Sequence, residues 1–538
     1  MSIDSVKPLS FLWKWLLFCF LSLPVTTVEA SSTADHSQFE VLQQEFSDVE
    51  DINAACVSCH NQAESQIHAT IHWQWTYPLE RDDTRKTVNK LLGKLNVING
   101  YHPNVASNIS ACGSCHIGYG LSKKITDTIP KAAVDCLACH DTTGEYFYSR
   151  FHQDGVECSM CHDDNGEANK DRVEKEGGRY TLSLTQMAQK VGETSVSSCG
   201  SCHFYDGGAD GAKHGDLDSA LIHADFEMDV HMSPDGAGLK CSDCHHSNQH
   251  ALAGSRYKAM SPVDNKPVSA LEGSRATCVS CHGDHPMKDE KLNDHTDVVA
   301  CQTCHIPHYA RNGISVKTSW DWSTAGELNR KRRPIAKHDE QGNVEYSSAK
   351  GTMTYGENLQ PTYQWYDGIL DYQTVGALVN PDGVTPLNAS HTQRDGVAKV
   401  FPFHVFESKL PFDTQSNQLL PMHLSSSSRN AFWNGYDWDK SLKAGARAVG
   451  MDFSGDFDFT DVETVRALNH TVAPVEQALQ CVDCHSVDGL LNDVPDLYVP
   501  GSRPHAWLDR MGLLVLLATL AGVLLHGLVR IIFALSRK

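Results

Sequence analysis

The sequence predicts a mainly α-helical fold with much irregular loop and few strands. The pattern Cys-x-x-Cys-His occurs nine times, mostly at short intervals. Clusters of Gly, Asn, Asp and Ser separate short apolar stripes and mark irregular loops. No strong alternation of polar and apolar residues, the signal of a half-buried strand, is present. Such a chain is expected to pack around the groups that its motifs bind.

Composition excludes several classes of protein. The chain has 538 residues, of which 41% are hydrophobic and 21% charged, and its formal net charge is −21. These values exclude a disordered chain and a membrane protein with many spans. The negative charge argues against nucleic acid as a partner, because binding to phosphates needs cationic side chains.

The repeated motif is the attachment site of c-type haem, which predicts a multihaem cytochrome c fold packed around a haem cluster. Its two thiols form thioethers with the haem vinyl groups, and the adjoining histidine is the proximal ligand of the iron. The attachment cysteines are Cys56, Cys59, Cys112, Cys115, Cys136, Cys139, Cys158, Cys161, Cys199, Cys202, Cys241, Cys244, Cys278, Cys281, Cys301, Cys304, Cys481 and Cys484. The proximal histidines are His60, His116, His140, His162, His203, His245, His282, His305 and His485. Nine covalent haems are predicted, with eight as the minimum.

Zinc sites and disulfides are the alternatives for Cys-x-x-Cys pairs. Neither requires a histidine directly after the second cysteine. Only 29 of the 538 residues are His, and nine matches out of nine by chance have a probability of roughly 10⁻¹¹, which favours the haem motif. The motifs use 18 of the 19 cysteines and leave only Cys19. Covalent haem therefore replaces disulfides in stapling the mature chain.

Residues 1–30 are typical of a secretory signal peptide. Lys7 and Lys14 provide the charged start, an apolar stretch follows, and residues 28–30 form a small-residue cleavage site. Cys19 lies in the apolar stretch and is expected to be removed. An uncleaved membrane anchor is the alternative. In either case the body of the protein is exported.

Residues 31–505 form the predicted periplasmic multihaem cytochrome c domain. Eight motifs lie within residues 56–305 and the last motif occupies residues 481–485. Two helices are predicted between the motifs from apolar stripes at helical spacing. The stripes consist of Val88, Leu91, Leu92 and Leu95, and of Leu184, Met187, Ala188 and Val191.

The segment 306–480 contains no cysteine and is rich in Trp, Tyr and Pro. Because the chain must return to bring the last motif against the others, this segment is expected to wrap the haem cluster. An independent domain is the alternative. Near its end, Pro474 is well placed in the first turn of a helix that runs into Cys481.

Residues 506–538 are predicted to form a C-terminal transmembrane anchor with a short cytoplasmic tail. Met511–Val529 contains 19 residues without formal charge, and the apolar run continues far enough to span a bilayer. Arg530 and Arg537 follow, so the positive-inside rule puts the haems on the periplasmic side of the bacterial inner membrane. A buried core helix is the alternative.

Each low-spin haem needs a second axial ligand. Of the 29 histidines, nine belong to the motifs and 20 lie elsewhere, which is enough for bis-histidine coordination at most haems. The pairing of these histidines with haems stays open. The better candidates are His72, His152, His231, His250, His285, His295, His404 and His470. His36 and His526 are poor candidates.

Several long segments resemble the octahaem tetrathionate reductase family of exported cytochromes c. The resemblance extends from about Cys56 to His485. It is carried by His72-Trp73, CGSCHIGYG at Cys112, CLACHDTTGEY at Cys136, CGSCHFYDGGADGAKHGDLD at Cys199, DVHM at Asp229, CQTCHIP at Cys301, WDWSTAG at Trp320 and NHTVAPVEQALQCVDCH at Asn469.

The resemblance implies one haem with a lysine as distal ligand in a substrate cleft. It assigns the motif of Cys112 to that haem, Lys213 to the distal ligand and Asp210 to its catalytic neighbour. A neutral amine is a more displaceable ligand than imidazole, and burial lowers the pKa of a lysine enough for it to bind iron. A solvated loop lysine is the alternative for Lys213. The chain departs from the family in its ninth motif, at Cys158, and in its membrane tail.

Three functions are compatible with the sequence. The first is a tetrathionate reductase-like oxidoreductase that reduces small sulfur or nitrogen oxyanions, with tetrathionate, nitrite and hydroxylamine as the substrates that the family suggests. The second is a non-catalytic electron-transfer conduit, and the third oxidises a sulfur compound in the reverse direction. The partners expected are a small oxyanion, an inner-membrane or periplasmic electron donor, and the lipid bilayer.

Overall fold

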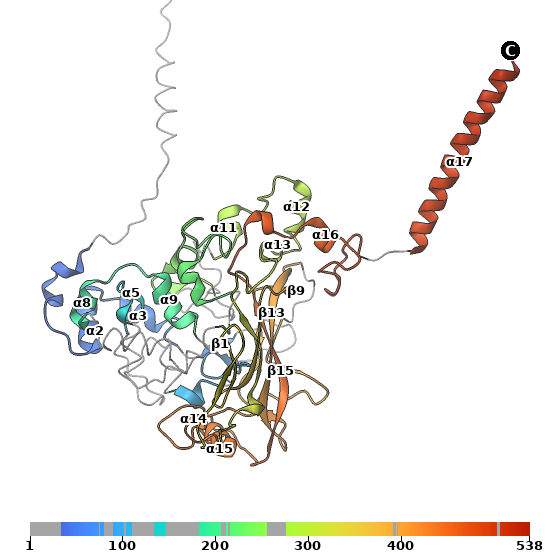
Figure 1. Cartoon of the computed structure of the whole chain (residues 1–538). Helices are drawn as coiled ribbons and strands as arrows, with labels where there is room; N and C mark the ends of the chain where they lie inside the picture. Colours follow the sequence, from blue (N-terminus) through green and yellow to red (C-terminus); the bar gives the residue numbers. More distant parts are fainter. Residues whose placement is uncertain are drawn as a thin grey trace, which may run out of the picture.

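The computed structural model describes residues 34–74, 76–79, 90–101, 104–109, 134–146, 182–205, 211–212, 216–254, 276–368, 370–390, 394, 396–502 and 506–537. Short helices that carry the Cys motifs lie beside a large β-sheet, and a long helix at the C-terminus stands apart from both (Figure 1). The predicted signal peptide and the motifs of Cys112 and Cys158 lie outside the described residues.

Seven described motifs are each built on a short helix or helical turn. These are α2 (Val49–Cys59), α5 (Leu137–His140), α9 (Val196–His203), α10 (Cys241–Cys244), α11 (Val279–His282), α13 (Cys301–His305) and α16 (Cys481–Cys484). Side-chain caps fix where the longer ones begin. The Asp48 carboxylate accepts from the Asp51 N–H at 2.9 Å, and the Ser195 hydroxyl accepts from the Ser198 N–H at 3.0 Å.

The expected helix with Leu184 is confirmed as α8 (Leu184–Gln189), which starts at a capping box of Ser183 and Gln186. The helix expected at Leu91 is wrong. Residues Lys90–Leu92 form strand β2, which pairs with β1 (Tyr77–Leu79), and a turn follows in which the Val97 N–H donates to the Gly93 carbonyl. Strand pairing overrides a helical spacing that was only about two turns long.

The helix expected between Pro474 and Cys481 is divided. Pro474 precedes the three-residue 3₁₀ turn η9 (Val475–Gln477), and α16 starts separately at Cys481. The remaining helical elements are η1 (His36–Gln38), η2 (Glu40–Leu42), α3 (Ala63–His68), η3 (Ala106–Asn108), η6 (Ser219–His223), α12 (Glu290–His295), η8 (Trp322–Thr324), α14 (Phe432–Gly435) and α15 (Trp438–Ala448).

A nine-stranded sheet corrects the expectation of few strands. Its strands run in the order β11-β15-β13-β5-β8-β7-β6, with β9 and β14 also paired to β13. They are β5 (Val316–Asp321), β6 (Ala336–His338), β7 (Val344–Ser347), β8 (Gly351–Gly356), β9 (Thr362–Tyr366), β11 (Thr385–Pro386), β13 (Lys399–Asp413), β14 (Gln418–Leu419) and β15 (Phe457–Ala467). Two-stranded sheets pair β3 (Ser247–Asn248) with β4 (Ala251–Leu252), and β10 (Asp371–Tyr372) with β12 (Asn388–Ala389).

The central strand shows why the sequence did not reveal this sheet. In β13 the five residues from Val400 to His404 are all buried, so both faces are covered and no alternation appears. All nine strands come from the Cys-free segment, and its core stacks Trp320 on Trp322 at 4.8 Å. Tyr101 and Ala212 belong to the same core. Through these two residues, the part of the chain that carries the motifs packs against the sheet.

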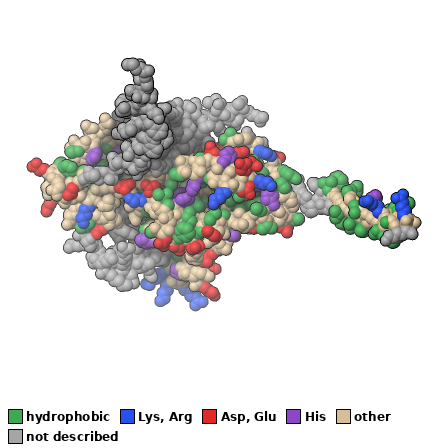
Figure 2. Space-filling view, turned by 90° about the horizontal axis from the view of Figure 1, so that it is seen from above, with side chains coloured by type: hydrophobic (Ala, Val, Ile, Leu, Met, Phe, Trp, Pro, Cys, Tyr) green, Lys and Arg blue, Asp and Glu red, His purple; other side chains and the backbone are tan. Residues whose placement is uncertain are grey.

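The C-terminal helix α17 (Ala506–Ser536) contains a candidate membrane span, Arg510–Ser536, none of which is buried. In Figure 2 it projects from the body as an apolar rod with basic side chains toward its far end. By length and composition this helix is able to cross a membrane.

Candidate haem centres

Each described motif presents its two cysteines and its histidine from one helical turn. The N–H of the histidine bonds to the carbonyl of the first cysteine, at 2.8 Å in His60, His245 and His485. Residues three and four positions apart lie on the same face of a helix. The local fold therefore puts two thiols and an imidazole on one side, as attachment to a single porphyrin requires.

Six of the seven described proximal histidines face a second histidine ring. The ring centroids are 5.9–6.5 Å apart in the pairs His36–His60, His72–His203, His140–His250, His231–His282, His245–His470 and His295–His485. An iron bound about 2 Å from a nitrogen of each ring separates the centroids by roughly 6 Å. The pairs therefore fit bis-histidine haem. Within the described ranges, the seventh proximal histidine, His305, has no second histidine ring at this separation.

Hydrogen bonds at Nδ1 orient several of these rings. Nδ1 of His140, His245 and His485 lies 2.9, 2.8 and 2.9 Å from the carbonyls of residues 192, 253 and 500. On the facing side, Nδ1 of His250 lies 2.8 Å from the Gln66 amide oxygen. A ring that donates from Nδ1 keeps Nε2 free for the metal, so these contacts select the tautomer that binds iron.

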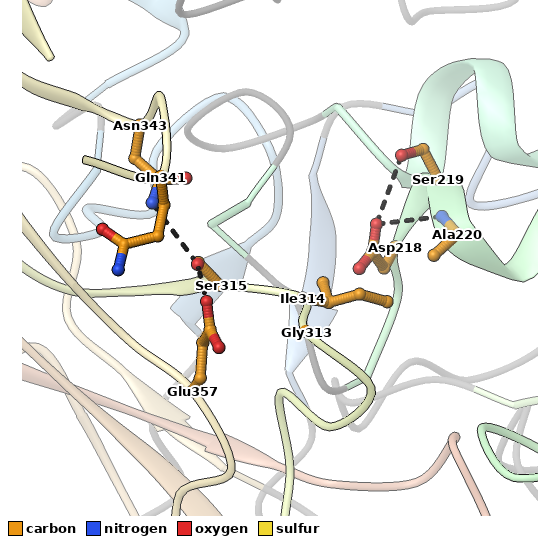
Figure 3. A pocket seen from close by; sticks show the side chains of 9 residues that line it. All are labelled: Asp218, Ser219, Ala220, Gly313, Ile314, Ser315, Gln341, Asn343 and Glu357. Carbon is orange, nitrogen blue, oxygen red and sulfur yellow. Dashed lines mark hydrogen bonds between the residues drawn. The ribbon is translucent and has the colours of Figure 1, made fainter. Parts of the chain in front are cut away.

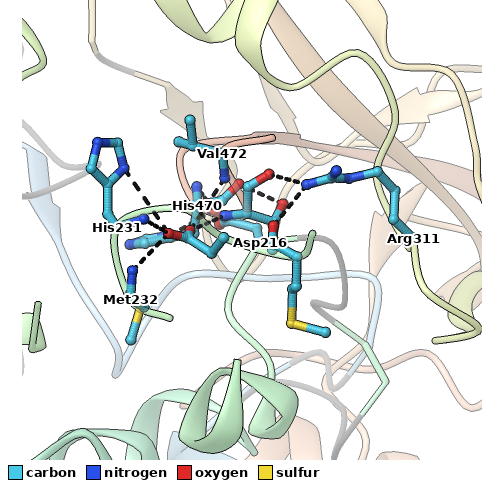
Figure 4. Close-up of polar contacts among 9 residues, drawn as sticks. Asp216, His231, Met232, Arg311, His470 and Val472 are labelled. Carbon is cyan, nitrogen blue, oxygen red and sulfur yellow. Dashed lines mark hydrogen bonds and ion pairs between the residues drawn. The ribbon is translucent and has the colours of Figure 1, made fainter. Parts of the chain in front are cut away.

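A network of two carboxylates surrounds His470 (Figure 4). Asp216 Oδ1 lies 2.7 Å from His470 Nδ1 and also accepts from the N–H groups of residues 469 and 470. Burial lowers the pKa of His470, but the Asp216 charge and hydrogen bond outweigh it and the net direction is upward. A histidine that faces a proximal ligand is thus bonded directly to a negative charge.

The second carboxylate, Asp229, joins two of the facing histidines. It is 2% exposed. Its Oδ1 accepts from the N–H groups of His231 and Met232 at 2.8 and 3.0 Å, and its Oδ2 from those of Thr471 and Val472 at 2.8 and 3.2 Å. Hydrogen bonds to a charged acceptor are the stronger kind. Asp229 therefore holds the loops of His231 and His470 in one rigid unit.

Arg311 closes this unit from the other side. Its Nη2 donates to the carbonyls of Met228 and Thr471 at 2.7 and 2.6 Å, and its Nη1 to the Glu227 carbonyl at 2.8 Å. Burial lowers the pKa of the Arg311 guanidinium, and the nearby acids offset only part of this shift. Two residues after Thr471, the N–H of Ala473 donates to the carbonyl of His305 at 2.8 Å.

The described motifs form one array in sequence order. Their first cysteines lie close enough for their thiols to interact in the pairs Cys56–Cys136, Cys199–Cys241 and Cys278–Cys301. Electrostatic contacts link these pairs through Cys139–Cys199, Cys244–Cys281 and Cys304–Cys484. The array therefore runs from Cys56 at one end to Cys481 at the other, between α2 and α16 in Figure 1.

The histidines predicted from the sequence fall into three groups. His72, His231, His250, His295 and His470 each face a proximal histidine. His285 and His404 face none of those described. His152 lies outside the described residues, as do Lys213 and Asp210.

His404 and His36 depart from the sequence expectation for different reasons. His404 is 1% exposed on β13 and packs against Tyr309 at 4.9 Å, and burial lowers its pKa to about 3. His36, which was predicted to be a poor candidate, stacks over His60 at 6.4 Å. Its position upstream of the first motif, in a chain so rich in histidine, could have indicated a distal ligand.

Lys213 lies outside the described residues, but the two residues before it, Gly211 and Ala212, are described. The Tyr101 hydroxyl donates to the Ala212 carbonyl and the Lys317 N–H to the Gly211 carbonyl, each at 2.9 Å. The Arg466 guanidinium lies 4.4 Å from the centre of the Tyr101 ring. These contacts fasten the chain that leads into Lys213 to the sheet, beside a cation.

The chain that leads into the Cys112 motif is fastened to the same part of the protein. The Ser107 hydroxyl and the Asn108 amide donate to the Met422 carbonyl at 2.9 and 2.7 Å. The Leu424 N–H donates to the Asn108 side chain at 2.6 Å. Both segments of the expected site therefore start from fixed points on the sheet domain.

A separate cavity of about 590 Å³ opens between η6 and the start of β5 (Figure 3). Its lining residues are Asp218, Ser219, Ala220, Gly313, Ile314, Ser315, Gln341, Asn343 and Glu357. Their polar groups bond to one another, as when Ser315 donates to Glu357 at 2.8 Å. None of the nine is a cysteine or a histidine.

Comparisons with known proteins agree with this geometry. A family model described as bacterial cytochrome c matches residues 317–488. An uncharacterized protein of Archaeoglobus fulgidus is 25% identical over 162 residues, and the match spans 28% of this chain and about half (50%) of that relative.

A solved octahaem cytochrome c from Shewanella oneidensis is similar over most of its length. The identity is 32%, the TM-score is 0.68, and the match covers 86% of this chain and 95% of that one. Bacterial c-type cytochromes are exported and carry covalent haem, so both properties extend to this protein. The chain belongs to the octahaem tetrathionate reductase family of multihaem cytochromes c.

Proposed function

We propose that this protein is a membrane-anchored periplasmic reductase of small sulfur or nitrogen oxyanions, with tetrathionate, nitrite and hydroxylamine as candidate substrates. Haem c, when bound, supplies one-electron transfer. The chain would hold nine such groups, one at each motif. Six histidine pairs at 5.9–6.5 Å support bis-histidine coordination, which suits electron transfer because both axial positions are filled.

A reductase needs one centre that opens to substrate, and Lys213 is our candidate for its displaceable ligand. The observation that carries this proposal is the bond between the Tyr101 hydroxyl and the Ala212 carbonyl. It fixes the residue before Lys213, just as Asn108 fixes the chain before the Cys112 motif. A buried, neutral amine binds iron more weakly than imidazole, so an oxyanion can replace it.

The neighbours of this site suit anion reduction. Arg466, beside Tyr101, contributes positive charge that attracts an oxyanion and stabilises negative charge developing during reduction. Asp210, three residues before Lys213, would carry protons to the reduced product. The substrate is thus expected to enter where a cation, a displaceable amine and an acid meet.

A ligand census of the purified oxidised protein tests this proposal. Near-infrared magnetic circular dichroism and EPR distinguish lysine–histidine from bis-histidine haem. We expect one lysine-ligated haem, and reduction of at least one of the three substrates by the dithionite-reduced protein. Bis-histidine ligation at every haem, together with no reduction of any of the three, would contradict the proposal.

The alternative of a pure electron conduit is favoured by one observation, the histidine that already faces six of the seven described proximal ligands. Oxidation of a reduced sulfur compound would use the same site in the opposite direction. Reduction potentials measured against those of the substrates decide the direction. The electron donor is proposed to lie in or near the inner membrane, with α17 as the anchor.

A further inference from the structure

The last motif lies at one end of the array and is the motif nearest to α17 in the sequence. Nδ1 of its histidine, His485, lies 2.9 Å from the Pro500 carbonyl. Gly501 follows in a left-handed conformation (φ +91°), where a Cβ would come within 3.2 Å of the His485 carbonyl. The chain leading to the anchor is thereby fastened directly to the proximal ligand of this motif.

Chain length limits how far this motif lies from the membrane helix. Ala506, where α17 starts, lies six positions after Pro500. At no more than about 3.6 Å for each residue, this stretch spans at most about 22 Å. The limit holds for every orientation of α17. The opposite end of the array, at Cys56, has no comparable tether to α17 within the described part of the chain.

The surface beside this motif exposes both acidic and apolar side chains. Residues 486–500 fold back over α16, where the Leu490 N–H donates to the Asp483 carbonyl at 2.8 Å. Exposed acids here are Asp488, Asp493 and Asp496. Exposed apolar side chains are Val482, Val487 and Tyr498, which are 67%, 57% and 75% exposed.

This charge pattern selects the kind of partner. Anionic lipid headgroups would repel three exposed carboxylates, so the surface does not suit direct contact with the bilayer. A protein surface that exposes basic and apolar side chains is complementary to it, and charge complementarity raises the rate of association. The short tether keeps this surface within reach of a partner that is itself held at the membrane.

We propose that electrons enter the protein at the Cys481 motif, from a membrane-bound quinol-oxidising protein whose docking surface is basic. The donor oxidises one quinol to a quinone, releases two protons and passes on two electrons, one at a time. Each electron would reduce one of the haems that the motifs would hold. The proposal rests on the haem loading and membrane anchoring proposed above, and it adds the entry point and the class of partner.

The test uses the full-length holoprotein in inner-membrane vesicles that contain its native respiratory chain. Reduced duroquinone drives haem reduction, which is followed in the Soret band without any oxyanion present. The variant combines Asp488→Lys, Asp493→Lys and Asp496→Lys, all at exposed positions. We expect quinol-driven reduction to slow at least tenfold and to lose most of its salt dependence, with reduction by dithionite unchanged.

A matched control reverses three exposed acids at the other end of the array, Glu40→Lys, Glu45→Lys and Glu50→Lys. Its quinol-driven rate should equal that of the unmodified protein. Equal rates in the two triple variants would overturn the proposal. A second variant, Cys481→Ala with Cys484→Ala, should contain one haem fewer and no longer accept electrons from quinol. Normal quinol-driven reduction there would also overturn it.

The result of this test does not depend on whether the protein is an oxyanion reductase. Because no oxyanion is present, a protein that is not a reductase still reports electron entry. Failure of anchoring is seen independently, as loss of the unmodified protein from the vesicles.

Discussion

The Tyr101 hydroxyl donates a 2.9 Å hydrogen bond to the carbonyl of Ala212, and both residues are fully buried in the core of the sheet domain. Tyr101 precedes the Cys112 motif by eleven positions, and Ala212 directly precedes Lys213. One bond therefore joins the two stretches of chain that would form the substrate site. Its loss should disturb that site more than it disturbs the remaining haems.

Tyr101→Phe tests this relationship. The variant leaves a buried carbonyl without its donor, which costs about 1–3 kcal/mol in the free energy of unfolding. We expect a lower midpoint of denaturant unfolding and a changed EPR signal for one haem only. Tyr498→Phe, at a side chain that is 75% exposed, should alter neither. An unchanged EPR spectrum in Tyr101→Phe would mean that the bond does not support the site.

Substitutions of Lys213 test its role as a ligand. Lys213→Leu removes the amine but keeps much of the stem volume, so one low-spin haem should become high-spin without loss of haem. Lys213→His supplies a stronger ligand and should suppress turnover. EPR spectra and reduction rates of tetrathionate, nitrite and hydroxylamine measure both effects. If Lys213→Leu leaves all of them unchanged, Lys213 is an ordinary surface lysine and the conduit function is favoured.

Haem stoichiometry follows from the nine motifs. A pyridine haemochrome assay, combined with intact mass, should give nine haems per chain. A value of eight would indicate an empty motif, with the one at Cys158 as the first candidate. Cys158→Ser with Cys161→Ser identifies it, because this variant should lose one haem only if the motif is normally loaded. Seven haems or fewer would contradict the assignment of the motifs.

Asp216→Asn tests how the chain sets the potential of one haem. The carboxylate bonded to His470 Nδ1 strengthens this histidine as a donor and stabilises the ferric state. An isosteric amide keeps the hydrogen bond but removes the charge. We expect the midpoint potential of the haem on Cys241 to rise by about 59 mV, a tenfold change for one electron. Spectroelectrochemical titration measures it.

The reverse change offers a matched control for Asp216→Asn. His250 Nδ1 is bonded to the neutral amide of Gln66 at 2.8 Å. Gln66→Glu would put a carboxylate there and should lower the potential of the haem on Cys136. If both variants titrate like the unmodified protein, hydrogen bonds at Nδ1 do not set these potentials.

Truncation before Trp507 tests the membrane anchor. The exposed apolar helix α17 is the one candidate span among the described residues. Without it, the protein should be released as a soluble form with its full complement of haem, because α17 buries nothing of the body. Ultracentrifugation and haem content measure both points. A truncated protein that still pellets with membranes would show that another segment is the anchor.

The sequence by itself determined the features that lie within a short stretch of chain. Cys-x-x-Cys-His places two thiols and an imidazole on one helical turn, so the attachment sites could be read residue by residue. The C-terminal helix was equally evident, because a long uncharged run needs no partner to be recognised. The family resemblance, which rests on motifs of the same local kind, is confirmed by the match to the Shewanella protein.

Only the tertiary structure decided which distant residues meet. His470 bonds to Asp216 across 254 positions and faces His245, and no local pattern distinguishes it from His404, which lies inside a sheet. That sheet was itself hidden, since β13 is covered on both faces and shows no alternation. Helical turns are closed by neighbours in sequence, whereas histidine pairs and buried strands depend on contacts between segments that the chain must first bring together.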